Sequence, residues 1–423
     1  MKIERKEIKQ GIFLNYLHME KFKTSCISLS LLTQLDKESA PVNALIPFVL
    51  TRGSSNYPDI EKISNRLDEL YGASIEPSVK LSGEIQCIGL YTTFVESSYL
   101  PAGNNILADT VSLIGELLLN PIMENGLFLE EYVESEKEKL ADVIRSTVNE
   151  KRSYSVKRCI QEMCAYEDFS VGKYGSAEDC ENVEREQLTD AYRNLLKSSP
   201  IEIFYCGSES LDTVFSLFAK AFSSLKRGHI NYDIGTDIRM NSVEESPRYF
   251  EENLDVTQGK LVLGFRLGEI MEDLDKSALM VFNTIYGSGV TSKLFNNVRE
   301  KLSLCYFASS MVDAMKGIML VSSGIEFENY DKAKDEILHQ LDEIKNGNIS
   351  DEELLFAKRG IISDLAAVKD NPCELELFYF NRILSGDDSS PEERSLQVET
   401  VTREDVMKVA NSVVLDLIYF LRN

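Results

Sequence analysis

YGSGVTSKLFNNVREKLSLCY, the stretch from Tyr286 to Tyr306, decides the fold because the chain contains its pattern twice. An apolar, helix-like run, Ala278–Ile285, leads into it. Gly287 breaks that run, since glycine favours turns over regular elements. An amphipathic segment then extends to Leu304, which lies 17 residues after the glycine.

The first half of the chain carries the same frame. There the apolar run is Ala44–Leu50, the break is Gly53, and the amphipathic segment ends at Leu70. Leu70 again lies 17 residues after the glycine. One agreement of this kind is weak evidence for a repeat, so the rest of the chain has to support it.

Both halves also end alike, with a helix followed by a strand. The first half ends with a helical pattern, Val183–Leu196, and a β-rich run, Ile201–Gly207. The second ends with the helical pattern Val401–Val413 and the run Leu417–Asn423. A threonine beside acidic residues is a typical helix start, and we expect that role for Thr189 and Thr402.

The middles of the two halves agree as well. Residues 74–94 and 304–327 each read as two β-rich runs around a polar turn, and two long helical patterns follow each of them. The sequence therefore predicts an α+β protein made of two homologous halves of about 200 residues, a usual domain size. We expect the halves at residues 1–225 and 248–423, joined by a polar linker at 226–247.

Composition narrows the class of protein. With 423 residues, of which 43% are hydrophobic, the chain can bury real cores. Its N-terminus is too charged for a signal peptide, and no apolar run approaches the roughly 20 residues that span a bilayer. Eight cysteines are scattered without a C-x-x-C pair, which favours reduced, buried thiols. These features predict a cytoplasmic protein.

The net charge of −24 argues against nucleic acid as a partner, because phosphate binding needs a basic surface. Much of the acid lies in helical patterns such as Leu129–Lys139, which are typical of a solvated helix face. An acidic surface that favours basic peptides is the alternative interpretation.

Several kinds of catalytic site are excluded by the residues themselves. The three histidines, His18, His229 and His339, are too far apart to form H-E-x-x-H or H-x-x-E-H. No G-x-S-x-G or strand-linked G-x-G-x-x-G motif is present. The segment around Lys293 is no phosphate loop, because Leu294 stands where such a loop needs Ser or Thr.

The stretch GSGVTSKLFNNVREKLSLCY resembles the C-terminal-half signature of the pitrilysin-like family, which includes insulin-degrading enzymes and mitochondrial processing peptidase. The shared features are a glycine-containing turn, Ser-Lys-Leu-Phe, then Arg-Glu-Lys and a tyrosine. The chain looks most similar to bacterial YmfF-type members, which lack the catalytic ligands. This resemblance implies a duplicated LuxS/MPP-like metallohydrolase fold, with two α/β sandwich halves in a clam-shell arrangement around a peptide.

The resemblance also implies where a metal would lie. Active members carry H-x-x-E-H on the first helix, with a third ligand from a later helix. Because FVLTRGS resembles the segment that starts at the second zinc histidine, Ala44 and Phe48 stand at the histidine positions and Pro47 at the general base. Asp142 lies roughly where the third ligand belongs. Catalytic zinc needs about three protein ligands, so we expect no metal and no peptide hydrolysis here.

The resemblance also implies that this chain keeps two residues that hold the substrate. By motif match these are Arg299 and Tyr306. We therefore expect a non-catalytic subunit that pairs with a zinc-binding chain bearing H-x-x-E-H. The alternative is a peptide-binding or scaffold protein without peptidase activity, as a homodimer or as an accessory to elongation factor P modification, to which YmfF-type relatives are linked by name. In either case we expect a peptide, perhaps a basic one, to add as a strand to a sheet edge.

Overall fold

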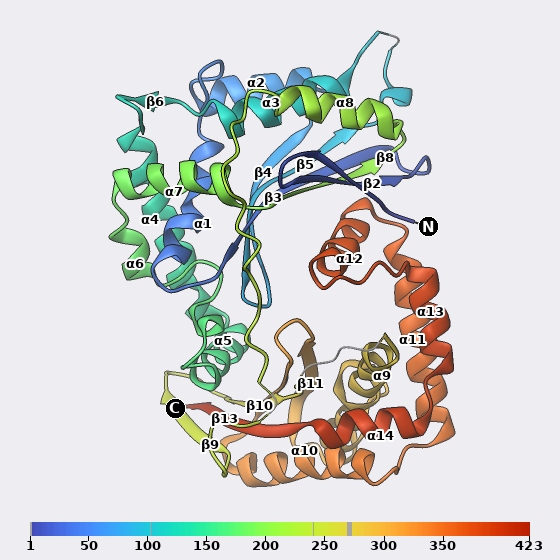
Figure 1. Cartoon of the computed structure of the whole chain (residues 1–423). Coiled ribbons are helices and arrows are strands. Elements are labelled where there is room, and N and C mark those ends of the chain that lie inside the picture. The colour runs from blue at the N-terminus through green and yellow to red at the C-terminus, as the bar shows by residue number, and fades with distance from the viewer. Residues whose placement is uncertain (1, 102, 240, 269–272) are drawn as a thin grey trace. The chain divides into compact units, whose positions relative to one another are not determined.

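The computed structural model describes residues 2–101, 103–239, 241–268 and 273–423 (Figure 1). The chain forms two compact units, each built from three segments. Unit 1 consists of residues 1–145, 171–235 and 368–390, and unit 2 of residues 146–170, 236–367 and 391–423. No helix among the described residues combines the length and the apolar character that crossing a membrane requires.

Unit 1 contains a six-stranded sheet in the order β1-β2-β8-β3-β5-β4. Neighbouring strands are antiparallel except β2 and β8. All seven residues of β8 are buried, as befits a strand covered on both faces. The strands are β1 Glu4–Lys9, β2 Ile12–His18, β3 Thr24–Gln34, β4 Ser74–Ser82, β5 Ile85–Val95 and β8 Ile201–Gly207.

The two faces of this sheet are covered by different parts of the chain. Ile203 and Tyr205 pack with the main helical layer, whereas their neighbours Phe204 and Cys206 pack against α12. Successive side chains of a strand point to opposite faces, so α12 covers the second face (Figure 1). The helices of unit 1 are α1 Ser39–Leu50, α2 Ile60–Glu69, α3 Ile106–Leu119, α4 Glu130–Ser146, α6 Ala177–Glu181, α7 Arg185–Ser198, α8 Leu211–Ala221 and α12 Pro372–Leu384.

A buried carboxylate fixes α12 on the sheet. Glu376 accepts a hydrogen bond from the Ser28 hydroxyl at 2.7 Å and pairs with the Lys80 ammonium at 3.0 Å. These partners come from β3 and β4. The polar contacts define where α12 sits, while Leu375 and Tyr379 supply the buried apolar area.

Unit 2 contains a five-stranded sheet in the order β11-β12-β10-β13-β9, in which only β13 and β9 run parallel. Its strands are β9 Arg248–Asn253, β10 Gly259–Arg266, β11 Cys305–Asp313, β12 Ile318–Ile325 and β13 Val414–Arg422. Its helices are α5 Lys151–Met163, α9 Asp273–Asn283, α10 Tyr330–Lys345, α11 Asp351–Val368, α13 Pro391–Thr400 and α14 Arg403–Ser412, with π-helical turns η4 Thr284–Ser288 and η5 Leu294–Lys301.

Helix α5 comes from the first half of the sequence, yet it packs on the sheet of unit 2. Cys159 and Met163 join Val262 and Tyr419 in one buried cluster. The approach depends on Gly264, because a Cβ there would lie 2.6 Å from the Met163 sulfur. Helices α5 and α12 each follow a long helix, α4 and α11, so each unit receives the corresponding helix from the other half of the sequence.

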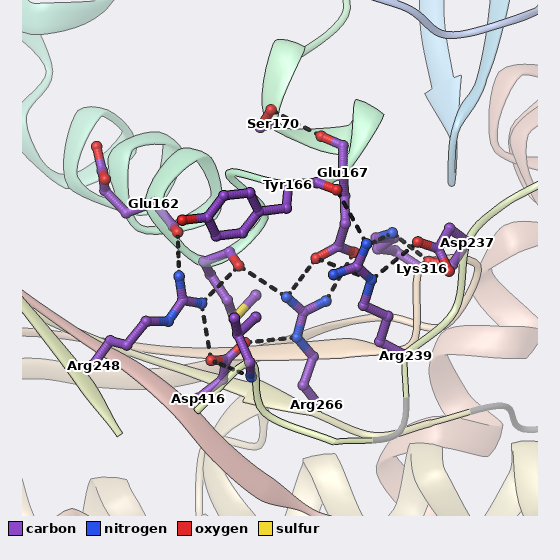
Figure 2. Close-up of polar contacts among 12 residues, drawn as sticks. Glu162, Tyr166, Glu167, Ser170, Asp237, Arg239, Arg248, Arg266, Lys316 and Asp416 are labelled. Atoms are coloured by element: carbon purple, nitrogen blue, oxygen red, sulfur yellow. Dashed lines mark hydrogen bonds and ion pairs between the residues drawn. The ribbon is translucent and has the colours of Figure 1, made fainter. Parts of the chain in front are cut away.

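A fully buried ion network holds the C-terminal end of α5 in unit 2 (Figure 2). The Arg266 guanidinium makes two hydrogen bonds to Glu167, at 2.6 and 3.0 Å, and one to Asp416 at 2.8 Å. The Lys316 ammonium lies 2.6 Å from Glu167. All four side chains have no exposed surface. Buried charges are tolerated when they are paired in this way.

The network also satisfies the last carbonyl groups of α5, which have no partner within the helix. Arg266 and Arg248 both donate to the carbonyl of Met163, at 2.9 and 2.8 Å, and Arg248 donates to that of Glu162 at 3.0 Å. Two cations at a helix C-terminus also suit the helix dipole. The network therefore joins α5 to β9, β10 and β13.

The structure confirms most of the elements expected from the sequence. The runs at 74–94 and 304–327 are the hairpins β4-β5 and β11-β12, and the two terminal helix–strand pairs are α7-β8 and α14-β13. Thr402 caps α14 in a capping box with Asp405. The expectation for Thr189 is wrong: it lies inside α7, and its hydroxyl bonds back to the carbonyl of Arg185 at 2.8 Å.

Replacing Arg266 by methionine should destabilise the protein by about 3–5 kcal/mol, because Glu167 and Asp416 would stay buried without their shared cation. The matched control is Arg403→Met, which removes an exposed ion pair with Asp351 worth about 1 kcal/mol or less. Urea unfolding followed by circular dichroism measures both. Equal midpoints for the two variants would contradict this role of the network.

The same network makes stability depend on pH. Burial alone would raise the pKa of Glu167, but hydrogen bonds from Arg266 and Lys316 outweigh it and lower that pKa. A lowered folded-state pKa contributes stability that is complete above the unfolded value of about 4.3 and is lost as pH falls through the folded value. Wild type should therefore exceed Glu167→Gln in urea midpoint at pH 7, and the gap should narrow as the pH falls below about 4.

Candidate functional site

The positions that we expect from the resemblance to correspond to the metal motif lie on α1. The helix starts beside Asp36, whose carboxylate accepts the backbone N–H groups of Glu38 and Ser39, both at 2.9 Å. Ala44 has no exposed surface, and Pro47 is buried inside the helix. Neither side chain carries an atom that can bind a metal or move a proton.

Phe48, at the remaining expected motif position, packs against another aromatic side chain. The Phe48 ring lies 6.4 Å from that of Tyr174 in an edge-on arrangement. Two turns earlier on the helix, Pro41 packs so closely against Gly175 that a Cβ on Gly175 would lie 3.0 Å from the proline ring. The residues on this part of α1 are thus packed by the segment 174–175, and the donor set does not fit zinc.

Possible metal ligands do not gather elsewhere in the described ranges. Within them, no group of three or more His, Cys, Asp or Glu side chains is arranged to hold a metal ion. Neither the family's metal position nor another place among these residues offers a ready-made set of ligands.

On helix α4, the carboxylate expected near the third-ligand position is not the one that faces the interior. Asp142 is exposed, whereas Glu136 is buried. The Glu136 carboxylate lies 3.1 Å from the Arg52 guanidinium and 2.7 Å from the Lys139 ammonium. Arg52 follows α1 by two residues and stacks 4.8 Å from the Tyr132 ring centre. The inward acid of α4 is therefore occupied by two cations.

The sequence contained the signal that separates these two acids. At about 100° per residue, Glu136 lies on the same side of α4 as the buried Val133 and Leu140. Asp142 is nine residues after Val133 and so lies about 180° away from it. Helical phase, rather than distance from the motif, identifies the carboxylate that faces inward.

Arg299 and Tyr306 lie in and after η5, a π-helical segment, in unit 2. Such wide turns are rare, and those that do occur are often found at functional sites. Leu294 and Val298 face the interior of unit 2. The segment ends at Lys301, and Ser303, between it and β11, adopts the left-handed conformation with a φ of +51°.

Both side chains are accessible to solvent. The Arg299 side chain is 44% exposed, lies 3.4 Å from the Glu300 carboxylate and stacks 4.8 Å from the Phe295 ring centre. Tyr306 is 65% exposed, and its hydroxyl donates to Glu326 at 3.1 Å. That hydrogen bond and the charge of Glu326 raise the pKa of Tyr306, so its phenol stays protonated and able to donate.

Three comparisons place these observations in a family. A family model described as "Peptidase M16 inactive domain" matches residues 182–361. A protein of Bacillus subtilis strain 168, described as "Probable inactive metalloprotease YmfF", is 31% identical to this chain over 99% of it and 97% of that protein. The chain belongs to the peptidase M16 family. The two-half fold agrees with this membership.

Solved structures of similar chains support the M16 assignment at the level of the fold. A conserved protein from Enterococcus faecalis V583 superposes with a TM-score of 0.89 at 27% identity, covering 100% of this chain and 99% of that one. A peptidase M16 inactive domain from Pseudomonas fluorescens gives a TM-score of 0.79 at 14% identity, covering 100% and 98%. The pitrilysin-like resemblance and the two-half fold expected from the sequence are thus confirmed.

This M16 chain should bind no zinc at α1, because Ala44, Pro47 and Phe48 offer no donor atoms. Elemental analysis after incubation with zinc and dialysis should give far less than one zinc ion per chain. Neither zinc nor EDTA should change the melting temperature, since a ligand that binds only the folded state would raise it. One zinc per chain with a matching thermal shift would contradict the account of α1.

Proposed function

We propose that this chain is a non-catalytic, peptide-binding subunit that pairs with a related chain bearing H-x-x-E-H. One observation carries the proposal: packed apolar side chains stand at the expected metal positions of α1, while Arg299 and Tyr306 stay exposed. In this arrangement the partner would supply the zinc and the general base. This chain would supply hydrogen-bond donors for the substrate.

The chemistry of the two exposed residues suits a peptide. A guanidinium donates forked hydrogen bonds to a carbonyl or carboxylate, and a protonated phenol donates one more. The ion pair of Arg299 with Glu300 is exposed and long, so it is worth little and competes weakly with a ligand. Tyr306 can likewise exchange Glu326 for a peptide oxygen.

The sheet edges favour β11 as the place where an extended peptide adds. Strand addition requires free main-chain N–H and C=O groups along an edge. β11 is an edge strand, contains no proline and carries both Tyr306 and the exposed Met311. The corresponding edge strand of unit 1, β4, has Pro77 in its middle, and proline has no N–H to donate.

The cysteines support a reducing, cytoplasmic setting for this function. All eight are free thiols in the structure, and seven of them are buried. Disulfides persist in oxidising compartments and are rare in the cytosol. The absence of any pairing among eight cysteines therefore favours the cytoplasm.

The proposal is tested by purifying the tagged chain from its native cells and assaying a reconstituted pair. We expect a stoichiometric partner bearing H-x-x-E-H. Arg299→Ala should lower the kcat/KM of the pair about tenfold or more, because a hydrogen bond from a charged donor contributes about 1.5–3 kcal/mol. Tyr306→Phe removes only the phenol and should lower it less.

Arg359→Ala is the matched control, since it removes another exposed arginine, on α11, with the same change in charge. It should leave kcat/KM unchanged. Equal kcat/KM in all variants would show that Arg299 and Tyr306 take no part in substrate binding. Recovery of this chain alone or as a homodimer would instead favour the scaffold function without peptidase activity.

A further inference from the structure

A cavity of about 400 Å³ opens on unit 1 between the C-terminal half of α7 and the segment that follows α8. Its apolar lining comes from Tyr192, Leu196 and Leu225. Its size lies in the range of small-molecule sites, about 300–1,000 Å³. It lies within unit 1 and includes none of the residues assigned above to peptide binding or to the metal motif.

The charged residues that line the cavity are all basic: Arg193, Lys197, Lys226 and Arg227. The overall composition would instead favour acidic side chains in a cavity, because the chain has 69 acidic residues and only 45 lysines and arginines. No carboxylate is among the lining residues. The cavity is therefore a local concentration of positive charge in a strongly acidic protein.

Arg227 is the most confined of these cations. Its guanidinium donates to three main-chain carbonyls, those of Gln10, Leu196 and Ser199. These acceptors are neutral, and burial lowers the pKa of Arg227. A partly buried cation whose hydrogen-bond acceptors carry no charge is costly, and an anion placed beside it offsets that cost.

The main-chain groups near the cavity do not oppose an anion. A helix C-terminus normally repels negative charge, but Arg227 donates to carbonyls at the C-terminal end of α7, and Lys9 donates to the two carbonyls that follow α8. The Lys9 ammonium lies 3.2 Å from the carbonyl of Phe222 and 2.8 Å from that of Ser223. Lys9 thus adds a fifth cation close to the four that line the cavity.

The remaining three cations that line the cavity are exposed to solvent. Lys197 and Lys226 reach solvent at the rim. Arg193 lies 3.3 Å from the Asp190 carboxylate, in an exposed pair of the kind that contributes little, and also donates to the carbonyl of Gly126. The Lys197 stem packs against Gly228, where a Cβ would lie 2.9 Å from it, so the ammonium is held near the cavity.

We propose that this cavity binds a small organic anion, a carboxylate carried on an apolar body. The apolar lining would cover the body, and the rim lysines and Arg227 would hold the carboxylate. A fatty acid and the C-terminal residue of a peptide share this chemistry. The site is independent of the peptide-binding function proposed for unit 2.

The test is calorimetric titration of the full chain with octanoate, which has both the carboxylate and the apolar chain. We expect saturable binding of one octanoate per chain that weakens with added salt. Acetate lacks the apolar chain, and octanol and octylamine lack the carboxylate. All three should bind much more weakly. N-acetyl-leucine replaces octanoate in a second series, and the tighter of the two ligands identifies a fatty acid or a peptide end as the source.

The variant pair Lys197→Gln with Lys226→Gln should weaken octanoate binding about tenfold, because two charge-assisted contacts are lost. The control pair Lys62→Gln with Lys332→Gln removes two exposed lysines elsewhere and should leave the affinity unchanged. Equal affinity in both double variants, equal binding of octylamine, or no octanoate binding at millimolar concentration would each overturn the proposal.

Discussion

The structure of unit 2 depends on one buried guanidinium. Arg266 has lost all contact with water, so it must satisfy its donors within the protein. Its partners, Glu167 and Asp416, lie 99 and 150 residues away along the chain. The cost of leaving any of these groups unpaired forces α5, β10 and β13 into one arrangement. Arg248 and Lys316 complete it, so the network specifies a position where apolar packing alone would allow several.

The exchange of helices follows from the nature of a sheet. A sheet whose two faces are both apolar needs cover on both sides. In each unit the main helical layer covers one face, and a single helix from the other half of the sequence covers the second. The two cases use different chemistry. Glu376 fixes α12 through Ser28 and Lys80, whereas arginines hold the end of α5.

The sequence predicted those features that depend on local periodicity. The hairpins β4-β5 and β11-β12 and the strands β8 and β13 were visible because alternation and apolar runs are local signals. The sequence did not show which sheet each helix covers. An amphipathic pattern indicates that one side of a helix is buried, but it does not identify the surface that buries it. The Arg266 network was invisible because each member, alone, resembles an ordinary charged residue. Its place along the chain puts Asp142 near the expected third-ligand position, whereas helical phase identifies Glu136 as the acid of α4 that faces inward.

The exchange of α12 has a consequence for how the protein is made. Once the first 235 residues have left the ribosome, every strand of the unit 1 sheet exists. The face that carries Phe204 and Cys206 still lacks its cover, because α12 ends at Leu384. Exposed apolar surface on a nascent chain is prone to aggregation. The N-terminal half must therefore wait, with one face of its core open to water, until α12 has been synthesised.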